Sequence, residues 1–355
     1  MSLWLMQWKR KWAALLIVGV LAFITGVFIK APRALEHYIF HQWEESASQV
    51  DLIVGYKGSP IQIVASTLYR LENPTGNISA DTYEYWQGHP LVLTATPIAL
   101  GDNVQGHPLV GTDSSYYSWF ELSLKEGHLP AASGEVVLDA ALADQLQVRI
   151  GTSLTSAHGR DSRGESHEHP LTVVGLLEAK RSADQSALFT VPQTYWTLHH
   201  SAEPSYTSVM LKLKSKAAML MLPNIISQRT DEQGAFPVFI FGQLQKQWQP
   251  TIDQATRWSW IIAAGVMLLF IAYISNMYHS ERNTIAFLRN HRGSTASIFM
   301  QVFGNVVALM ILGLLLSEFV IQSLIGVAPV VNEQMAMLLT VALGAGFLWI
   351  KLRKS

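Results

Sequence analysis

A polar stretch with three histidines offers the sequence's clearest potential for metal chemistry. His158, His167 and His169 lie in HGRDSRGESHEHP (158–170), which also carries three acidic residues close to them. Imidazole is the commonest metal-binding side chain near neutral pH, and a His-x-His pattern beside carboxylates can hold zinc or a similar ion. The alternative is a solvated hairpin loop between a strand that ends near residue 154 and one that starts near 171. The pair His199-His200 carries no spacing signal.

Other motifs that support catalysis are missing from the sequence. No G-x-x-x-x-G-K-[ST] phosphate loop occurs, because GYKGSP (55–60) lacks the spacing, and no G-x-S-x-G occurs. The His-Glu-His at 167–169 is not the H-E-x-x-H of zinc proteases. With no cysteine, the chain has no disulfide, thiolate zinc site or cysteine nucleophile. We therefore expect no catalytic residue, and zinc is the only cofactor suggested for this chain.

The composition indicates a membrane protein. Of 355 residues, 49% are hydrophobic and 14% are charged, against about 25% charged in an ordinary soluble domain. This balance excludes intrinsic disorder, which needs low hydrophobicity and high charge. The net charge of -1 gives no sign of a nucleic-acid partner, whose binding domain would be strongly basic.

Four apolar runs predict four transmembrane helices, at 12–30, 258–278, 297–325 and 335–350. A helix rises 1.5 Å per residue, so about 20 apolar residues cross a hydrocarbon core of about 30 Å. The third run is longer and must tilt or extend beyond the membrane. The first run exceeds the apolar region of a typical signal peptide and lacks a clear cleavage site, so we expect an uncleaved span.

Lysine and arginine set the orientation of these spans. They occur in the tail 1–11, in the loop 279–296 and in the tail 351–355, whereas the loop 326–334 has none. We therefore expect both termini and the 279–296 loop in the cytoplasm. Residues 31–257 form one extracytoplasmic insertion between the first and second spans.

The insertion reads as an α+β domain, because segments with strand and helix patterns alternate along it. A helix is expected to continue outward from the first span through Trp43. The other expected helices are 61–71, 140–148 and 215–230, and the expected strands are 51–60, 135–139, 171–179, 187–192, 208–214 and 236–242.

The 279–296 loop has the pattern of a short amphipathic helix. Ile285 and Leu288 are three residues apart and share a face, with Phe287 beside them. Arg282 and Arg289 are seven apart and share another face, while Gly293 is placed to end the helix. Such a helix offers a partner an apolar ridge with basic sides. The alternative is an ordinary solvated loop that is positive because it is cytoplasmic.

Two polar residues lie inside the third span. Glu318 is ionisable, so it should face the bundle interior, a dimer interface or water, unless it sits near the outer headgroups. Asn305 is the second intramembrane polar residue. The sequence leaves a functional and a positional role for Glu318 equally open.

Several segments resemble the FtsX/MacB-type ABC transporter permeases. The segments that carry the resemblance are LVGTDSSYYSWFELSLKEGHLPAASGEVVLDAALADQLQVRIGTSL (109–154), LTVVGLLEA (171–179), DQSALFTVP (184–192) and ERNTIAFLRNHRGSTASIF (281–299). Their order and their placement in the predicted topology are similar to the family's pattern. The chain departs from that pattern at Asn283, at Asn290-His291-Arg292 and at Asn305.

The resemblance implies a permease subunit with a MacB-like core domain in the periplasm, embedded in the lipid of a bacterial cytoplasmic (inner) membrane. It implies a dimer with a second permease copy and a separate cytoplasmic ABC ATPase that binds ATP and magnesium. The residues expected to couple to that ATPase are Arg282, Ile285, Phe287, Leu288, Arg289 and Gly293. ATP-driven motion would then pass through the first two spans into the outer domain, which is called mechanotransmission.

Two other functions fit the same sequence. An FtsX-like regulator would use the motion to activate a periplasmic partner, and a periplasmic adaptor or substrate-binding protein would be the companion of an exporter. A membrane-anchored zinc-handling protein would instead use the histidine-rich stretch. Identifying the molecule that the protein transports or binds would distinguish among these three functions.

Overall fold

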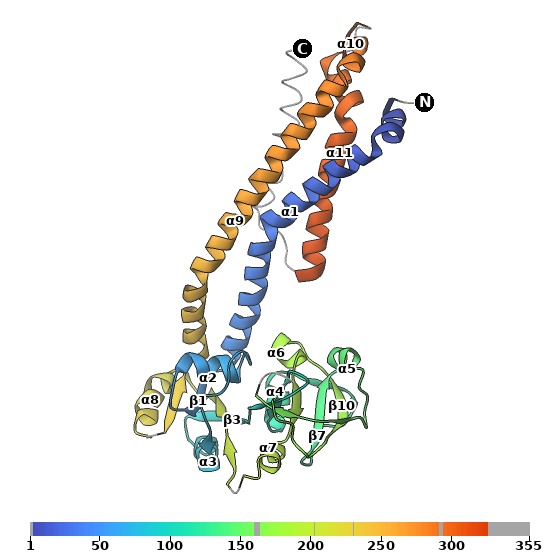
Figure 1. Cartoon of the computed structure of the whole chain (residues 1–355). Coiled ribbons are helices and arrows are strands. Elements are labelled where there is room, and N and C mark those ends of the chain that lie inside the picture. Colours follow the sequence, from blue (N-terminus) through green and yellow to red (C-terminus); the bar gives the residue numbers. More distant parts are fainter. Residues whose placement is uncertain (1–2, 160–163, 202, 230, 291–293, 326–355) are drawn as a thin grey trace. The chain divides into compact units, whose positions relative to one another are not determined.

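The computed structural model describes residues 3–159, 164–201, 203–229, 231–290 and 294–325. The chain divides into a helical unit, drawn from Met1–Phe40 and Gln247–Ser355, and an α+β unit formed by His41–Lys246. The described helices are α1 (Leu3–Gln49), α2 (Pro60–Thr67), α3 (Ala80–Gln87), α4 (Ser114–Trp119), α5 (Ala140–Leu146), α6 (Ser182–Gln185), α7 (Pro192–Leu198), α8 (Lys216–Ser227), α9 (Pro237–Ser280), α10 (Arg282–Asn290) and α11 (Thr295–Ile325) (Figure 1).

The strands all belong to the α+β unit. They are β1 (Leu52–Tyr56), β2 (Ile78–Ser79), β3 (Val92–Ile98), β4 (Asp102–Val104), β5 (His107–Gly111), β6 (Ser123–Gly127), β7 (Glu135–Asp139), β8 (Ser153–Leu154), β9 (Ala157–His158), β10 (Leu171–Glu178), β11 (Leu188–Thr190), β12 (Ser205–Tyr206), β13 (Ser208–Leu213) and β14 (Glu232–Ala235). One sheet has the order β14-β1-β13-β3. A larger sheet has the order β6-β10-β7-β11-β5-β4-β9, with β8 paired to β10. The predicted α+β class is confirmed.

Each sheet carries its own apolar core. Buried side chains such as Leu52, Trp86 and Val209 pack around the four-stranded sheet, while Leu138 and Leu188 pack within the larger one. Local caps fix the short helices that cover them. Asp139, for example, accepts a hydrogen bond from the amide of the second residue of α5, which satisfies a donor that the helix leaves unpaired.

The segment 236–242 is helical, so its predicted strand is wrong. Pro237 opens α9, where its fixed φ suits the first turn and its missing amide costs nothing. Ile240, Phe241 and Leu244 are buried, whereas Val238 and Phe239 are exposed. This spacing follows the helical period, which a seven-residue apolar run could not reveal on its own. The other predicted strands and helices of the insertion coincide with β1, α2, β7, α5, β10, β11, β13 and α8.

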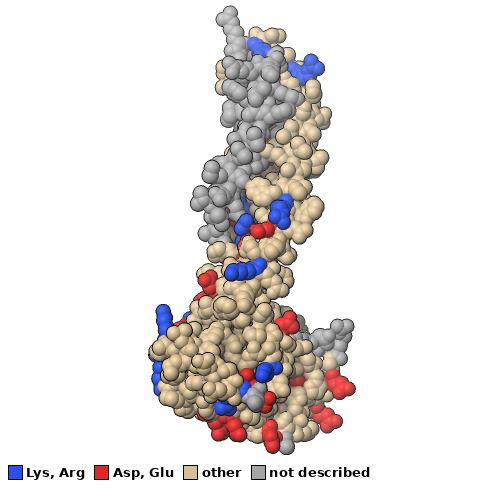
Figure 2. Space-filling view, turned by 90° about the vertical axis from the view of Figure 1, so that its left-hand side faces the viewer, with Lys and Arg blue, Asp and Glu red and all other residues tan. Residues whose placement is uncertain are grey.

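The helical unit is built from long apolar helices. Among the described residues, three stretches are long and apolar enough to cross a membrane: Leu15–Gln49, Pro237–Ser280 and Gly304–Ser323. They contain or overlap the first three predicted spans, while the predicted span 335–350, its preceding loop 326–334 and the tail 351–355 lie outside the described residues. In Figure 2 the visible, described surface of these helices carries long stretches without Lys, Arg, Asp or Glu.

Small residues let α1 and α11 approach closely. A Cβ added to Gly26 would lie 2.1 Å from the Ser317 hydroxyl, and one added to Gly313 would lie 2.4 Å from the Gly19 carbonyl oxygen. Small residues allow such close backbone contacts between membrane helices, where van der Waals packing replaces the hydrophobic effect as the driving force.

Candidate functional site

The histidine-rich stretch folds back on itself in a short hairpin. The His158 amide donates to the Glu165 carbonyl (3.0 Å), and the His167 amide donates to the Ser156 carbonyl (2.9 Å). These bonds bring the His158 and His167 rings to a centroid distance of 4.2 Å. The predicted hairpin is thus present, but it is not simply solvated, because the His167 side chain is only 7% exposed.

A buried carboxylate faces these two rings. Strand β4 pairs antiparallel with β9, and Asp102 lies directly opposite His158 in the register. Side chains that oppose each other in this way share a face of the sheet. The Asp102 Oδ1 atom lies 3.4 Å from His158 Nδ1 and 3.3 Å from His167 Nε2. The Asp102 side chain itself is fully buried.

A third imidazole reaches the same carboxylate from a different element. His199 follows the last residue of α7, and its Nε2 lies 2.9 Å from Asp102 Oδ2. The hydrogen bond to Asp102 raises the pKa of His199, and partial burial opposes this rise. The His199 ring lies 5.0 Å from each of the rings of His158 and His167.

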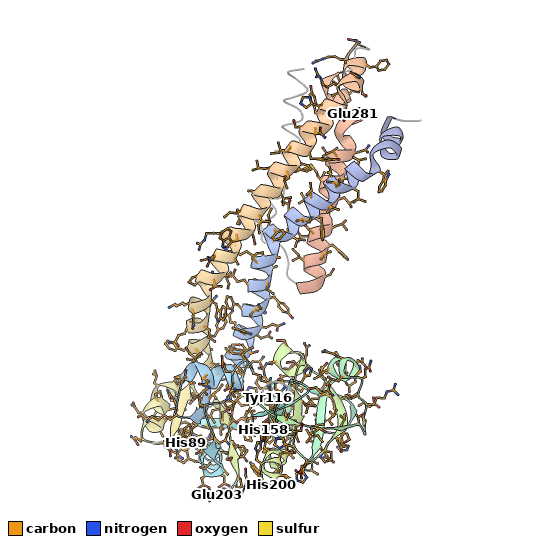
Figure 3. The ribbon with its side chains drawn as sticks, viewed as in Figure 1. His89, Tyr116, His158, His200, Glu203 and Glu281 are labelled. Carbon is orange, nitrogen blue, oxygen red and sulfur yellow. The ribbon has the colours of Figure 1, made fainter. Side chains whose placement is uncertain are left out.

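The donor atoms of Asp102, His158, His167 and His199 all lie within 4.8 Å of one another. Such a group of three imidazoles and one carboxylate is a ligand set that zinc accepts. The structure therefore brings together two of the three predicted histidines. It places His169 elsewhere, with its ring 5.9 Å from that of His200. Figure 3 labels His158 and His200 in the α+β unit.

Sequence reasoning missed Asp102 and His199. Neither belongs to a motif, and both lie far along the chain from the histidine-rich stretch. Only the β4–β9 pairing and the end of α7 bring them to it.

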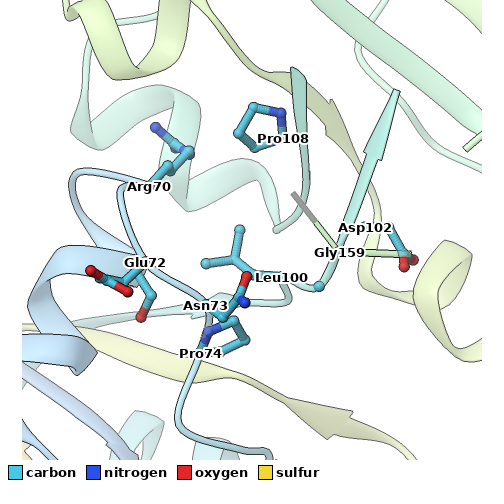
Figure 4. A pocket seen from close by; sticks show the side chains of 10 residues that line it. Arg70, Glu72, Asn73, Pro74, Leu100, Asp102, Pro108 and Gly159 are labelled. Carbon is cyan, nitrogen blue, oxygen red and sulfur yellow. The ribbon is translucent and has the colours of Figure 1, made fainter. Parts of the chain in front are cut away.

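Two cavities border this group. One of about 320 Å³ is lined by His199, Tyr195 and Trp196 among others. The other, shown in Figure 4, has a volume of only about 30 Å³, and its lining includes Arg70, Leu100 and Asp102. Because that smaller volume holds about one water molecule, the larger cavity is the one with room for a ligand.

The predicted coupling helix corresponds to α10. Ile285 is 5% exposed and packs in an apolar cluster with residues of α1, α9 and α11. Phe287 is 61% exposed, and Arg282 and Arg289 are exposed as well. Ile285 therefore faces the long helices rather than solvent. The Leu288 side chain and Gly293 lie outside the described residues.

Glu318 and Asn305, the two polar residues predicted to lie inside the membrane, both belong to α11. Glu318 forms an ion pair with Lys30 of α1, whose side chain is 2% exposed. Asn305 is 2% exposed. The pairing supplies a positional explanation for Glu318, because an ionisable side chain within a span is expected to pair with a partner in the bundle.

A buried ionic network lies in the α+β unit between α2, α4 and α6. The Arg70 guanidinium lies 3.0 Å from Asp184 Oδ1, and both side chains are at most 3% exposed. The Tyr116 hydroxyl donates to the same oxygen (2.6 Å). Burial raises the pKa of Tyr116 to about 12, so the phenol keeps its proton and donates at neutral pH. Sequence reasoning did not single out these residues.

Comparison with known proteins identifies the family of the chain. Residues 14–226 match the model of the MacB-like periplasmic core domain, which is more than half of the chain. The chain belongs to this family. This confirms the resemblance to FtsX/MacB-type ABC transporter permeases. No curated protein matches the chain.

Solved structures of two transporter domains are similar to part of the chain. The periplasmic region of MacB from Actinobacillus actinomycetemcomitans is 15% identical, with a TM-score of 0.40, over 57% of this chain and 96% of that structure. The extracellular domain of the noncanonic ABC-type transporter YknZ from Gram-positive bacteria is 15% identical, with a TM-score of 0.33, over 49% of this chain and 88% of that structure.

The family match covers some of the candidate features and leaves out others. In this MacB-like chain it includes all four residues of the Asp102 group, and also Arg70 and Asp184. It ends before α9, α10 and α11, so it does not cover the predicted coupling helix.

Proposed function

We propose that the chain is the transmembrane permease subunit of an ABC-type export or mechanotransmission complex in a bacterial inner membrane. A separate cytoplasmic ATPase would hydrolyse ATP, a second permease copy would complete the dimer, and the α+β unit would lie in the periplasm. The observation that carries the proposal is that α1 and α9 each contribute residues to both units of this MacB-like chain. A helix shared by two units can pass a displacement from one to the other.

The last turns of α1 are held firmly within the α+β unit. The Trp43 ring stacks on Tyr69 at a centroid distance of 5.1 Å, and the Tyr69 hydroxyl donates to the Trp43 carbonyl (3.0 Å). The Ser46 hydroxyl accepts a hydrogen bond from Arg181 Nε (3.1 Å). The Gln49 carbonyl accepts one from the Trp119 indole (3.1 Å). These contacts support transmission, because a shift of this segment must also move the elements bonded to it.

The geometry of α10 supports its use as the contact with the ATPase. Phe287 presents an exposed apolar ring, and the exposed Arg282 and Arg289 share another face of the same helix. Ile285 on the buried side packs against the spans. A push on Phe287 would therefore reach α1, α9 and α11 through packed side chains.

Copurification of the full chain from its own membranes in mild detergent tests the proposal. We expect a P-loop ATPase among the companions identified by mass spectrometry. Phe287→Asp should remove that ATPase, because it places a charge in the apolar contact. Phe239→Asp is the matched control, since Phe239 is 67% exposed and lies in the α+β unit. Loss of the ATPase in both variants, or in neither, would refute the assignment of α10.

The orientation has an independent test, because the chain has no cysteine of its own. Single cysteines can be placed at Lys125 in β6 and at Asn290 in α10, both of which are exposed. In intact cells whose outer membrane is permeabilised, an impermeant maleimide should label Lys125→Cys and spare Asn290→Cys until the inner membrane is broken. The reverse pattern would invert the proposed topology.

A further inference from the structure

We propose that Asp102, His158, His167 and His199 form a binding site for a zinc-like divalent metal ion in the α+β unit. This inference does not depend on an ATPase partner. Of the three histidines in the polar stretch 158–170, His158 and His167 belong to the site and His169 does not. Asp102 of β4 and His199 at the end of α7 complete it.

Two of the distances between donor atoms match those around a tetrahedral ion. Zinc–nitrogen distances of about 2.0–2.1 Å place neighbouring ligand atoms about 3.3 Å apart. Asp102 Oδ1 lies 3.4 Å from His158 Nδ1 and 3.3 Å from His167 Nε2. His199 Nε2 lies 2.9 Å from the other oxygen, Asp102 Oδ2, so small rotations of the carboxylate and the ring would complete the set.

Two of these donor atoms are buried without a hydrogen bond. Among the described residues, neither His167 Nε2 nor Asp102 Oδ1 has a hydrogen-bond partner, although the two atoms lie 3.3 Å apart. Buried polar atoms without partners are costly and rare in native proteins. Their convergence on one point is explained if both donate lone pairs to the same cation.

The donor set favours zinc over other ions. Three imidazole nitrogens and one carboxylate oxygen are too rich in nitrogen for calcium or magnesium, which prefer oxygen ligands. The chain has no cysteine, so the site lacks the thiolate that draws softer ions. Zinc, Co²⁺ and Ni²⁺ all accept such ligands, and a site of four protein ligands favours zinc and Co²⁺, which are commonly four-coordinate.

The site is open enough to exchange its ion. The His158 side chain is 48% exposed and that of His199 is 33% exposed, whereas Asp102 is fully buried. The cavity of about 320 Å³ reaches His199. A bound ion would tie together β4, the hairpin that holds His158 and His167, and the end of α7. Occupancy would therefore link these three elements.

Zinc binding to the full chain in detergent tests the proposal, with an affinity tag free of histidine. The protein is stripped with a chelator and then titrated with zinc against a chromogenic competitor. His158→Ala and His199→Gln alter exposed ligands, so both variants should fold. His169→Ala and His200→Ala are matched controls outside the group. Circular dichroism checks folding in every case.

We expect each ligand variant to bind one zinc ion fewer per chain than the wild type, or to bind that ion with an affinity at least about 100-fold lower. Mutation of residues that only hydrogen-bond to metal ligands already lowers metal affinity by about 10–100-fold. The two controls should retain the wild-type affinity. Co²⁺ should give the intense visible absorption of a tetrahedral complex in the wild type and lose it in His158→Ala. Equal zinc affinity in the wild type and both ligand variants, or loss confined to the controls, would overturn the proposal.

Discussion

Replacing Asp184 by alanine perturbs the ionic network most directly. The Asp184 carboxylate is 1% exposed, lies 3.0 Å from Arg70 and 3.3 Å from Arg181, and accepts a hydrogen bond from Tyr116. Without it, a guanidinium that is 3% exposed keeps its charge but loses its counter-ion. Removing one partner of a buried ion pair costs about 3–5 kcal/mol.

This cost converts into a measurable thermal shift. For a domain of 150–250 residues, about 1 kcal/mol changes the midpoint of thermal unfolding by about 2–4 °C. We therefore expect Asp184→Ala to lower the midpoint of the α+β unit by about 6–20 °C. Near-ultraviolet circular dichroism of the full chain in detergent follows this transition, because Tyr116 and its aromatic neighbours lie in the affected region.

Two further variants separate charge from hydrogen bonding. Asp184→Asn keeps an acceptor for Tyr116 but removes the negative charge, so its loss should approach that of alanine if charge dominates. The double variant Arg70→Met with Asp184→Leu removes both charges of the most buried pair and leaves only the less buried Arg181. It should be less destabilising than Asp184→Ala alone. A shift below about 2 °C in Asp184→Ala, or a double variant at least as destabilising as Asp184→Ala, would refute the electrostatic reasoning.

Three more predictions follow from the packing and charges. Gly313→Ala should lower the stability of the helical unit by about 1–3 kcal/mol, because its Cβ would meet a backbone carbonyl of α1. Gly265→Ala has open space around it and should not lower the stability. Unfolding titrations in detergent compare the two variants, and equal losses would contradict the packing. Lys30→Met should destabilise the spans more than Lys30→Met combined with Glu318→Gln, measured in the same way; the opposite order would contradict a buried pair. Two backbone amides lower the pKa of Glu135 in the folded protein. The stability that this carboxylate contributes is therefore present above its pKa in the unfolded chain and is lost as the pH falls through its pKa in the folded protein. Glu135→Gln should flatten this part of the acid unfolding curve, and an unchanged curve would contradict the prediction.

Much of the fold follows from local pattern. Apolar runs near 20 residues long predicted the first three spans, because only such runs satisfy both the bilayer thickness and the backbone hydrogen bonds. Alternation predicted strands such as β10, where buried and less buried residues alternate from Leu171 to Glu178. Local pattern failed at 236–242, because this short apolar run is the first part of the long helix Pro237–Ser280 and seven residues are too few to show the helical period.

The sequence by itself determined the α+β class and the long apolar helices within the described residues, and it singled out one polar stretch as a candidate metal site. The tertiary structure decided which residues meet. A bend at Glu168 and His169 ends the extended run of the hairpin, so His167 turns to Asp102 while His169 lies beside His200. Asp102 and His199 join the group because strand pairing and helix ends bring together residues that are far apart in the chain. No local spacing encodes such a meeting, since it depends on the register of β4 against β9 and on where α7 ends.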